Sequence, residues 1–386
     1  MSELIPIITT TLGIRPELAG KIISGLMSGT YERVGGVIRD VGSKEVVAWL
    51  RDLPQTQPID ATVLSSLGPL LPLNVVTSVL NLSISVIGFG VVMKRLNTIE
   101  GQLQTISGIL AGVNRKLDLS FYSNFRAALE LARTAFSMRE DTNRRISATQ
   151  AINRFLEAEH HYLGMLDTEL QAGSQAVSPF LNTLFLAYVS TARCYLELGE
   201  TETAWRHFQE GEAALSSRVR QYYSSIVGVK PAIFLHPGLA DSISLERLTR
   251  LLRHYDGSLN ESSVFENLRK EIWETASRKP ETWLRKLPAS IWDHEVDGRE
   301  KKAIGRRPRS GEEMLKQVLP RLPEAFAQVE LAHESLGCIE GYGIESRYLL
   351  DHNIEYRAWQ QIEIPATKQD DPIAVLLPKN SMLLAN

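Results

Sequence analysis

The chain has 386 residues, which is long enough to bury a large core and to form two or three structural units. Its hydrophobic share of 44%, charged share of 23% and formal charge of -3 are ordinary for a folded protein and argue against a whole-surface attraction for nucleic acid. Its two cysteines, Cys194 and Cys338, argue against a disulfide framework or a four-cysteine metal site and favour a reducing compartment.

Residues 1–60 predict a small α/β unit. The first residues lack the basic region and continuous apolar run of a secretory signal, so we expect a cytoplasmic protein that associates with the inner face of a membrane. A short helix closed by glycine is predicted over 15–29. Two β-rich runs, Val34–Arg39 and Glu45–Leu50, predict a hairpin around the turn "VGSK". Because two strands are too few to be stable alone, the hairpin should dock on another element.

Residues 61–119 predict an apolar, membrane-competent helix that continues as a coiled coil. Leu67 to Met93 contains no charged residue over 27 positions, more than the roughly 20 that cross a bilayer core. Two prolines break its start, which leaves a helix from Leu73 of about 31 Å. Lys94 and Arg95 follow, as at a cytoplasmic interface.

Small and polar residues within the apolar run share one helical face. Such a face suits contact with another helix, or a water-filled lumen. The residues of this membrane stripe are Asn74, Thr77, Ser78, Asn81, Ser85 and Gly88.

Downstream of the run, apolar residues alternate by three and four over three heptads, which predicts an oligomer seam. The seam residues are Leu96, Ile99, Leu103, Ile106, Leu110, Val113 and Leu117. Extending this frame backwards puts the membrane stripe on or beside the seam, as a conditional pore of several copies needs. The alternative is a helix permanently buried in a soluble bundle, with its polar groups paired to neighbours.

Residues 120–227 predict helical hairpins, with Ser123 and Asp141 as candidate caps of helices near 124–138 and 142–166. Within them, the chain resembles one tetratricopeptide repeat over 179–217. The matching residues are Tyr188, Ala192 and Tyr195 in a first helix, Gly199 at the turn, and Ala204 and Phe208 in a second helix. Two residues depart from the pattern, with Thr191 in place of the usual leucine and Gly211 in place of the later alanine, and no proline follows where the repeat normally ends. The resemblance implies a surface for a protein helix or peptide, with Tyr188, Tyr195 and Phe208 as candidate peptide-binding residues.

Residues 228–386 predict a charged helical region, with helices near 241–255, 261–276, 311–337 and 344–361 and an extended segment at "IAVLL" near the end. Its loop 298–310 carries six cations that would attract anionic lipid head groups. They are Arg299, Lys301, Lys302, Arg306, Arg307 and Arg309. An ordinary solvated loop is the alternative. No aromatic residues are interleaved for base stacking, so a nucleic-acid partner is not expected.

No catalytic signature stands out, and we expect neither enzyme activity nor a cofactor. Glu157, Glu159, His160 and His161 carry ligand-type atoms, but adjacent histidines on a helix point about 100° apart, so no metal site is expected there. Catalytic residues that are distant in the chain would escape such a search, so an enzyme with an unfamiliar site is a third reading.

Together these patterns predict a mainly α fold with a long central helix, a body of tetratricopeptide-like hairpins and a small N-terminal α/β unit. The function we expect is that of a non-enzymatic membrane-acting effector, of a toxin or defence type. It would form homo-oligomers through the seam and open a pore when triggered. The alternative is a soluble interaction scaffold with the apolar helix buried in its core.

Overall fold

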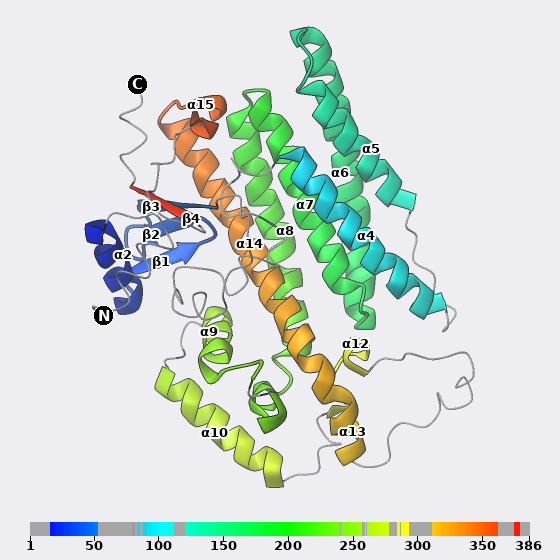
Figure 1. Ribbon diagram of the computed structural model, residues 1–386, viewed down its shortest axis with the longest axis vertical. Coiled ribbons are helices and arrows are strands. Elements are labelled where there is room, and N and C mark those ends of the chain that lie inside the picture. Colours follow the sequence, from blue (N-terminus) through cyan, green and yellow to red (C-terminus); the bar gives the residue numbers. More distant parts are fainter. Residues whose placement is uncertain are drawn as a thin grey trace.

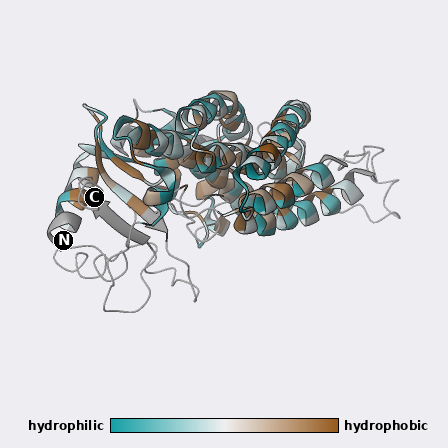
Figure 2. Cartoon of the chain, turned by 90° about the horizontal axis from the view of Figure 1, so that it is seen from above, coloured by the Kyte–Doolittle hydropathy of each residue, from teal (hydrophilic) through white to brown (hydrophobic). Residues whose placement is uncertain are grey.

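The computed structural model describes residues 16–52, 80, 84, 88–111, 120–239, 241–256, 259, 261–277, 284–285, 287–292, 311–361 and 374–378. Over these residues the protein is mainly helical, with one small antiparallel sheet beside the helices (Figure 1). The view from above shows the sheet at one side of the helical bundle (Figure 2). The predicted fold class is confirmed.

Six helices pack into the bundle. They are α4 (Phe89–Ala111), α5 (Ser120–Ala135), α6 (Asp141–Ala172), α7 (Val177–Glu197), α8 (Thr201–Ile226) and α14 (Leu322–Asp351). Helix α7 lies inside it, because 19 of its 21 residues are buried. Its sequence is apolar or small at most positions on every face, as a covered helix requires, and its buried Arg193 is paired with Glu197. Edge-to-face ring pairs such as Phe125 with Phe155 join neighbouring helices.

Shorter elements lie at both ends of the bundle. The α-helices are α9 (Leu245–Tyr255), α10 (Glu261–Ser277), α12 (Ala289–Trp292), α13 (Gly311–Val318) and α15 (Tyr356–Gln360). Helices α9, α10, α12 and α13 lie low in the view of Figure 1, and α15 lies at the upper end of α14. The 3₁₀ turns are η1 (Pro231–Leu235), η2 (Pro237–Leu239) and η3 (Leu319–Arg321). The predicted caps differ from the structure. Helix α5 starts before Ser123, and the N-cap of α6 is Glu140, which makes no side-chain cap bond.

The sheet has four antiparallel strands in the order β1-β2-β3-β4. They are β1 (Tyr31–Val34), β2 (Val37–Asp40), β3 (Val46–Asp52) and β4 (Ala374–Pro378), and helix α2 (Pro16–Ser28) precedes them. The first predicted strand is split, because Gly35 and Gly36 turn the chain between β1 and β2. Gly35 has a φ of 53°, which a two-residue hairpin turn requires. Strand β4 confirms the predicted extended segment near the C-terminus.

The sheet docks on α14 through a close approach of two backbones. A Cβ at Gly341 would lie 2.9 Å from the Val34 carbonyl oxygen, so only glycine fits there. Helix α14 therefore continues through the glycines at which we expected two separate helices to meet. Each helical glycine costs about 1 kcal/mol relative to alanine, and the contact with the sheet offsets that cost.

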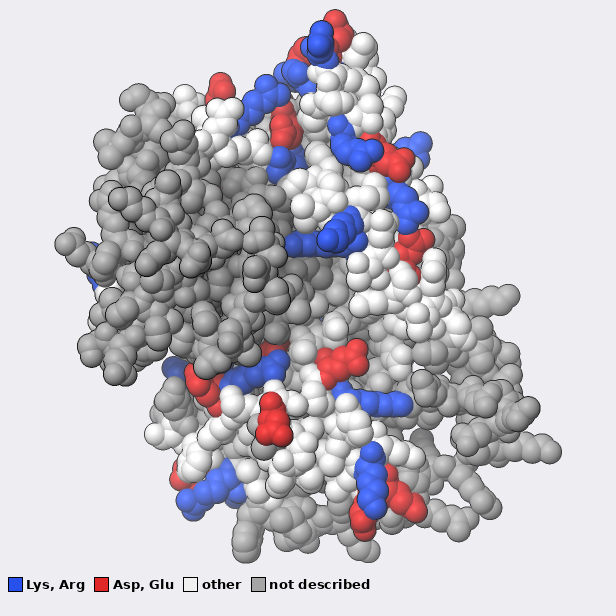
Figure 3. Space-filling model, viewed as in Figure 1, with Lys and Arg blue, Asp and Glu red and all other residues white. Residues whose placement is uncertain are grey.

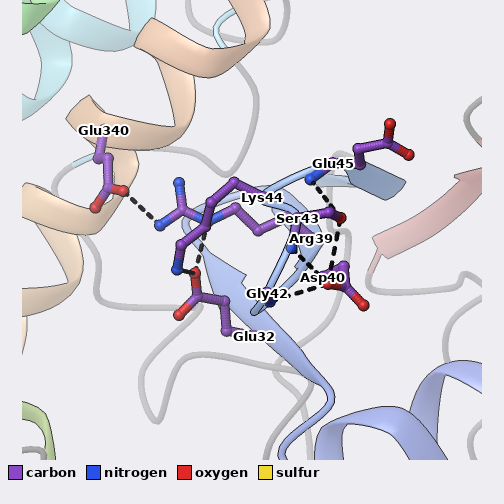
Figure 4. A network of polar contacts seen from close by, with 8 residues as sticks. All are labelled: Glu32, Arg39, Asp40, Gly42, Ser43, Lys44, Glu45 and Glu340. Atoms are coloured by element: carbon purple, nitrogen blue, oxygen red, sulfur yellow. Dashed lines mark hydrogen bonds and ion pairs between the residues drawn. The ribbon is translucent and has the colours of Figure 1, made fainter.

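Two ion pairs flank this contact. Arg33 Nη2 donates to both carboxylate oxygens of Glu334 at 2.9 Å. Arg39 Nη2 donates to Glu340 at 2.9 Å and its Nε to Glu32 at 2.7 Å (Figure 4). The next turn is closed by Asp40, whose carboxylate accepts from the backbone N–H groups of residues 42 and 43, and these bonds lower its pKa.

At its described residues before α4, the apolar run is not the helix that we expected from Leu73. Helix α4 begins at Phe89, and the earlier described members of the run, Leu80 and Ile84, lie in a bend and a turn. Both are buried, at 2% and 0% exposure, in the hydrophobic core. Within the described ranges, no helix combines the length and apolar character that a membrane crossing requires.

Candidate functional site

The backbone of Ile84 is held by side chains from α7, α14 and α15. Its N–H donates to Glu345 Oε2 at 3.2 Å. Its carbonyl oxygen accepts from Arg193 Nη1 at 3.2 Å and from the Tyr356 hydroxyl at 3.3 Å. We call Arg193, Glu345 and Tyr356 the polar seat. All three are buried, with at most 8% exposure.

Further contacts orient the polar seat. The indole N–H of Trp359 donates to Glu345 Oε1. Arg193 donates to Glu197 Oε1 from Nε at 3.2 Å and from Nη2 at 3.0 Å, and its guanidinium lies 5.1 Å from the centre of the Tyr356 ring. Burial raises the pKa of Tyr356, which keeps its hydroxyl protonated as a donor. The seat therefore offers fixed donors to the carbonyl and an acceptor to the N–H of one residue, Ile84.

The seat also connects to the sheet. Trp49 of β3 packs edge-on against Trp359, with ring centres 5.4 Å apart, and against Tyr348 at 5.1 Å. These rings are part of the same hydrophobic core as Leu80 and Ile84. Strand β3, helix α14 and helix α15 thus meet beside Ile84.

Burial makes the seat energetically sensitive. A buried charge is tolerated only when it is paired and hydrogen-bonded, as Arg193 is to Glu197 and Glu345 is to Trp359. Removing one partner leaves a buried polar group unsatisfied, at a cost of about 1–3 kcal/mol. Chemically, the arrangement can hold a backbone segment, because donors and an acceptor meet the two polar groups of one residue.

The predicted membrane stripe lies almost wholly outside the described residues. Of its members, Gly88 is described; it precedes α4, and its carbonyl oxygen accepts from the N–H groups of Val91 and Val92 at 2.9 and 3.2 Å. The others, Asn74, Thr77, Ser78, Asn81 and Ser85, are not among the described residues, and neither are the six cations of the loop 298–310. On the face in Figure 3, acidic and basic side chains of the described residues are interspersed.

The first part of the predicted oligomer seam packs inside the protomer. Leu96, Ile99 and Leu103 are buried in the core, and Ile106 is partly buried against it. The side chain of Leu110, with Val113 and Leu117, lies outside the described part of the chain. In this conformation, therefore, the buried seam residues contact other helices of the same molecule.

The segment that resembles a tetratricopeptide repeat forms the hairpin of α7 and α8, with Gly199 at the turn and a φ of 81°. Its candidate peptide-binding rings point into the molecule. Tyr188 and Phe208 are buried, Phe208 lies 5.6 Å from the Tyr342 ring of α14, and Tyr195 is partly buried. Neither Tyr188 nor Phe208 is open to a peptide in this conformation, because other helices of the protomer cover them.

The two departures from the repeat pattern have structural reasons. Thr191 donates to the buried Glu159 carboxylate at 2.5 Å, and His207 Nε2 lies 3.1 Å from the same oxygen. A Cβ at Gly211 would lie 2.8 Å from the Tyr188 ring, so the ring occupies the space of the usual alanine. Glu159, one of the ligand-type residues of α6, thus holds a hydroxyl and an imidazole. Among the residues that the structure describes, no three His, Cys, Asp or Glu side chains gather as metal ligands would.

Sequence reasoning missed the polar seat. Arg193 and Glu345 were not singled out, because they lie far apart in the chain and each sits within a helical run that contains other polar residues. The sequence holds one usable signal, which is an arginine with a glutamate four residues later in an otherwise uncharged α7. Comparison of the chain with protein-family models, with curated proteins and with solved structures finds no match.

Proposed function

We propose that this protein is a non-enzymatic membrane-acting effector, stored in an inactive state in which the polar seat retains its apolar segment. The observation that carries this proposal is the grip of buried Arg193 and Glu345 on the backbone of Ile84. Ile84 lies within an uncharged run long enough to cross a bilayer. A trigger that breaks the grip would free this run.

The chemistry of the grip supports release. Ile84 is held by hydrogen bonds between its backbone and side chains. Water can replace these bonds without breaking the backbone hydrogen bonds of α7 or α14. Apolar burial of Leu80 and Ile84 stabilises the stored state, at roughly 1.5–3 kcal/mol for each large side chain. A lipid phase offers the same apolar surroundings, so moving the run from the bundle to a bilayer keeps that gain.

Assembly would follow release. Leu96, Ile99 and Leu103 pack inside the protomer, so a second copy could reach this seam once α4 leaves the bundle. Homo-oligomers would then form at the inner face of the membrane, with the basic loop 298–310 near anionic lipid. A toxin or defence role fits such a conditional pore.

The test is leakage of dye from anionic vesicles. Arg193→Met and Glu345→Gln weaken the grip, and a loss of about 1–3 kcal/mol raises the released population roughly 5- to 150-fold. We expect both variants to release dye at correspondingly lower protein concentration than the unchanged protein. Arg247→Met is the matched control, since it breaks a different buried pair, with Glu330, away from Ile84. Equal leakage by control and seat variants would assign the effect to general unfolding and reject the proposal.

A soluble interaction scaffold is the second candidate. It is favoured by the burial of Leu80, Ile84 and the first seam residues within a single protomer. In that case the seat is a permanent structural feature, and partners bind elsewhere on the helical hairpins. Absence of vesicle binding and leakage for the seat variants, with their fold intact by circular dichroism, would favour this candidate.

A further inference from the structure

Two histidines meet where α9 crosses α14. His254, near the end of α9, and His333 of α14 have ring centres 3.6 Å apart with an angle of 45° between the rings. Tyr255 lies beside them, 5.7 Å from the His333 ring, and stacks at 3.7 Å on Tyr223 of α8. Three helices are therefore joined at one cluster of aromatic and imidazole rings.

Two polar atoms in this cluster are sealed from solvent. The Nδ1 atom of His333 and the hydroxyl of Tyr255 have no hydrogen-bond partner among the described residues. A protonated imidazole carries N–H groups on both ring nitrogens, so a charged His333 would bring a donor to a place without an acceptor. That charge would also lie against the imidazole of His254, which is in ring contact with His333.

The charged groups around the pair do not provide that acceptor. The acid that faces it is Glu334, and both of its oxygens already accept from Arg33 at 2.9 Å. Arg220 of α8 lies over the Tyr255 ring at 5.7 Å and donates to the Tyr255 carbonyl at 3.3 Å. Two guanidinium groups and one occupied carboxylate therefore surround the two imidazoles.

We infer that the contact between α9 and α14 is an acid-sensitive joint, closed while both imidazoles are neutral and opened when one of them takes a proton. The side chains that opening would expose include Leu248, Leu251 and Leu252, which α9 buries in the core. This inference concerns a different part of the molecule from the polar seat and does not depend on a membrane.

The direction of the pH effect follows from linkage. Burial, with a contribution from His254, lowers the pKa of His333 to about 3, and burial also lowers that of His254. The open state takes up protons near the ordinary value of 6.5, whereas the closed state excludes them. The closed form of the joint is therefore favoured above pH 6.5. Below that pH, the equilibrium constant for closing falls up to tenfold per pH unit for each histidine.

Two acids across the same contact modify this effect at lower pH. Burial raises the pKa of Glu330, which bonds Arg247 of α9, so its protonation favours the closed form and opposes the histidines. Burial would raise the pKa of Glu334, but its ion pair with Arg33 outweighs burial and lowers it, so protonation of Glu334 favours opening. Between pH 7.5 and 5.5 Glu334 stays charged, and any protonation of Glu330 can only reduce the opening that the histidines cause.

Hydrogen exchange on the full chain tests the joint. We expect the equilibrium constant for opening at amides 245–256, corrected for the intrinsic effect of pH on exchange, to rise when the pH falls from 7.5 to 5.5. Protonation of His333 alone should raise it about tenfold. His333→Phe keeps a ring but cannot be charged, so its rise should be several-fold smaller. His160→Phe, at an exposed position of α6, is the control and should behave like the unchanged protein.

A second measurement does not depend on any variant folding. Titration of the histidine ring protons by NMR in the unchanged protein should place His333 well below the ordinary range. A pKa near 6.5 for this residue would overturn the inference. An opening constant of the α9 amides that does not change across the same pH window would also overturn it.

Discussion

Two segments are fixed on α14 by different physical means. The sheet docks by shape, through the close approach of Val34 and Gly341, with the Arg33–Glu334 and Arg39–Glu340 ion pairs at its sides. Ile84 is fixed by charge, through the buried polar seat. A close approach of two backbones is disrupted when a side chain adds atoms between them. A buried, charged hydrogen-bonded contact is disrupted when one partner is removed, and water can also replace its hydrogen bonds.

The largest effect is expected from Arg193→Met. It leaves Glu197 without its Arg193 partner and removes one of the two bonds to the Ile84 carbonyl, and breaking a buried pair costs about 3–5 kcal/mol. Urea unfolding should show this loss in the free energy of unfolding. Arg347→Met removes an exposed ion pair with Asp351 and is the control, with an expected loss below about 1 kcal/mol. Equal losses in the two variants would mean that the seat does not stabilise the fold.

A smaller effect is expected where the sheet docks. Gly341→Ala adds a Cβ at 2.9 Å from the Val34 carbonyl oxygen, and such overpacking costs about 1–3 kcal/mol. Gly337→Ala, one turn earlier, places its Cβ at an ordinary 3.6 Å from Gly35 N and should gain up to about 1 kcal/mol from helix propensity. Thermal unfolding of the two variants compares them directly. The close-contact account fails if both alanines shift the melting temperature in the same direction.

The smallest effect is expected at the ion pairs beside the sheet. Glu340→Gln weakens a pair with Arg39 in which the acid is 33% exposed, so the loss should be about 0.5 kcal/mol. Glu334→Gln affects a bidentate pair with 18% exposure and should cost about 1 kcal/mol or more. Urea unfolding at low and high salt separates them, because the exposed pair is screened more strongly. A greater loss for Glu340→Gln would contradict the ranking by burial.

Most of the helices and the hairpin could be predicted from the sequence, since local periodicity and turn residues determine them. The predictions that were wrong have causes in the tertiary structure. A helix stop expected within 338–343 did not occur, because Gly341 serves a contact with a strand some three hundred residues away. The apolar run was expected to be helical from its start, but Ile84 lies in a turn whose backbone is paired to distant side chains.

The candidate site was less accessible to sequence reasoning than the fold. Heptad spacing predicted Leu96, Ile99 and Leu103 as a seam between copies of the chain, with burial in a soluble bundle as the alternative; in the described state the same molecule covers them. Arg193 and Glu345 meet at Ile84 only after three elements have packed. No local pattern encodes such a meeting.

The exchange rate of the Ile84 amide tests the central claim most directly. Its N–H is bonded to buried Glu345, so the unchanged protein should protect it strongly in water. In Arg193→Met with anionic vesicles, we predict at least tenfold faster exchange at Ile84, while amides in the middle of α7 stay protected. Protection of Ile84 that is the same in both proteins, with and without vesicles, would contradict the claim that the polar seat stores a releasable segment.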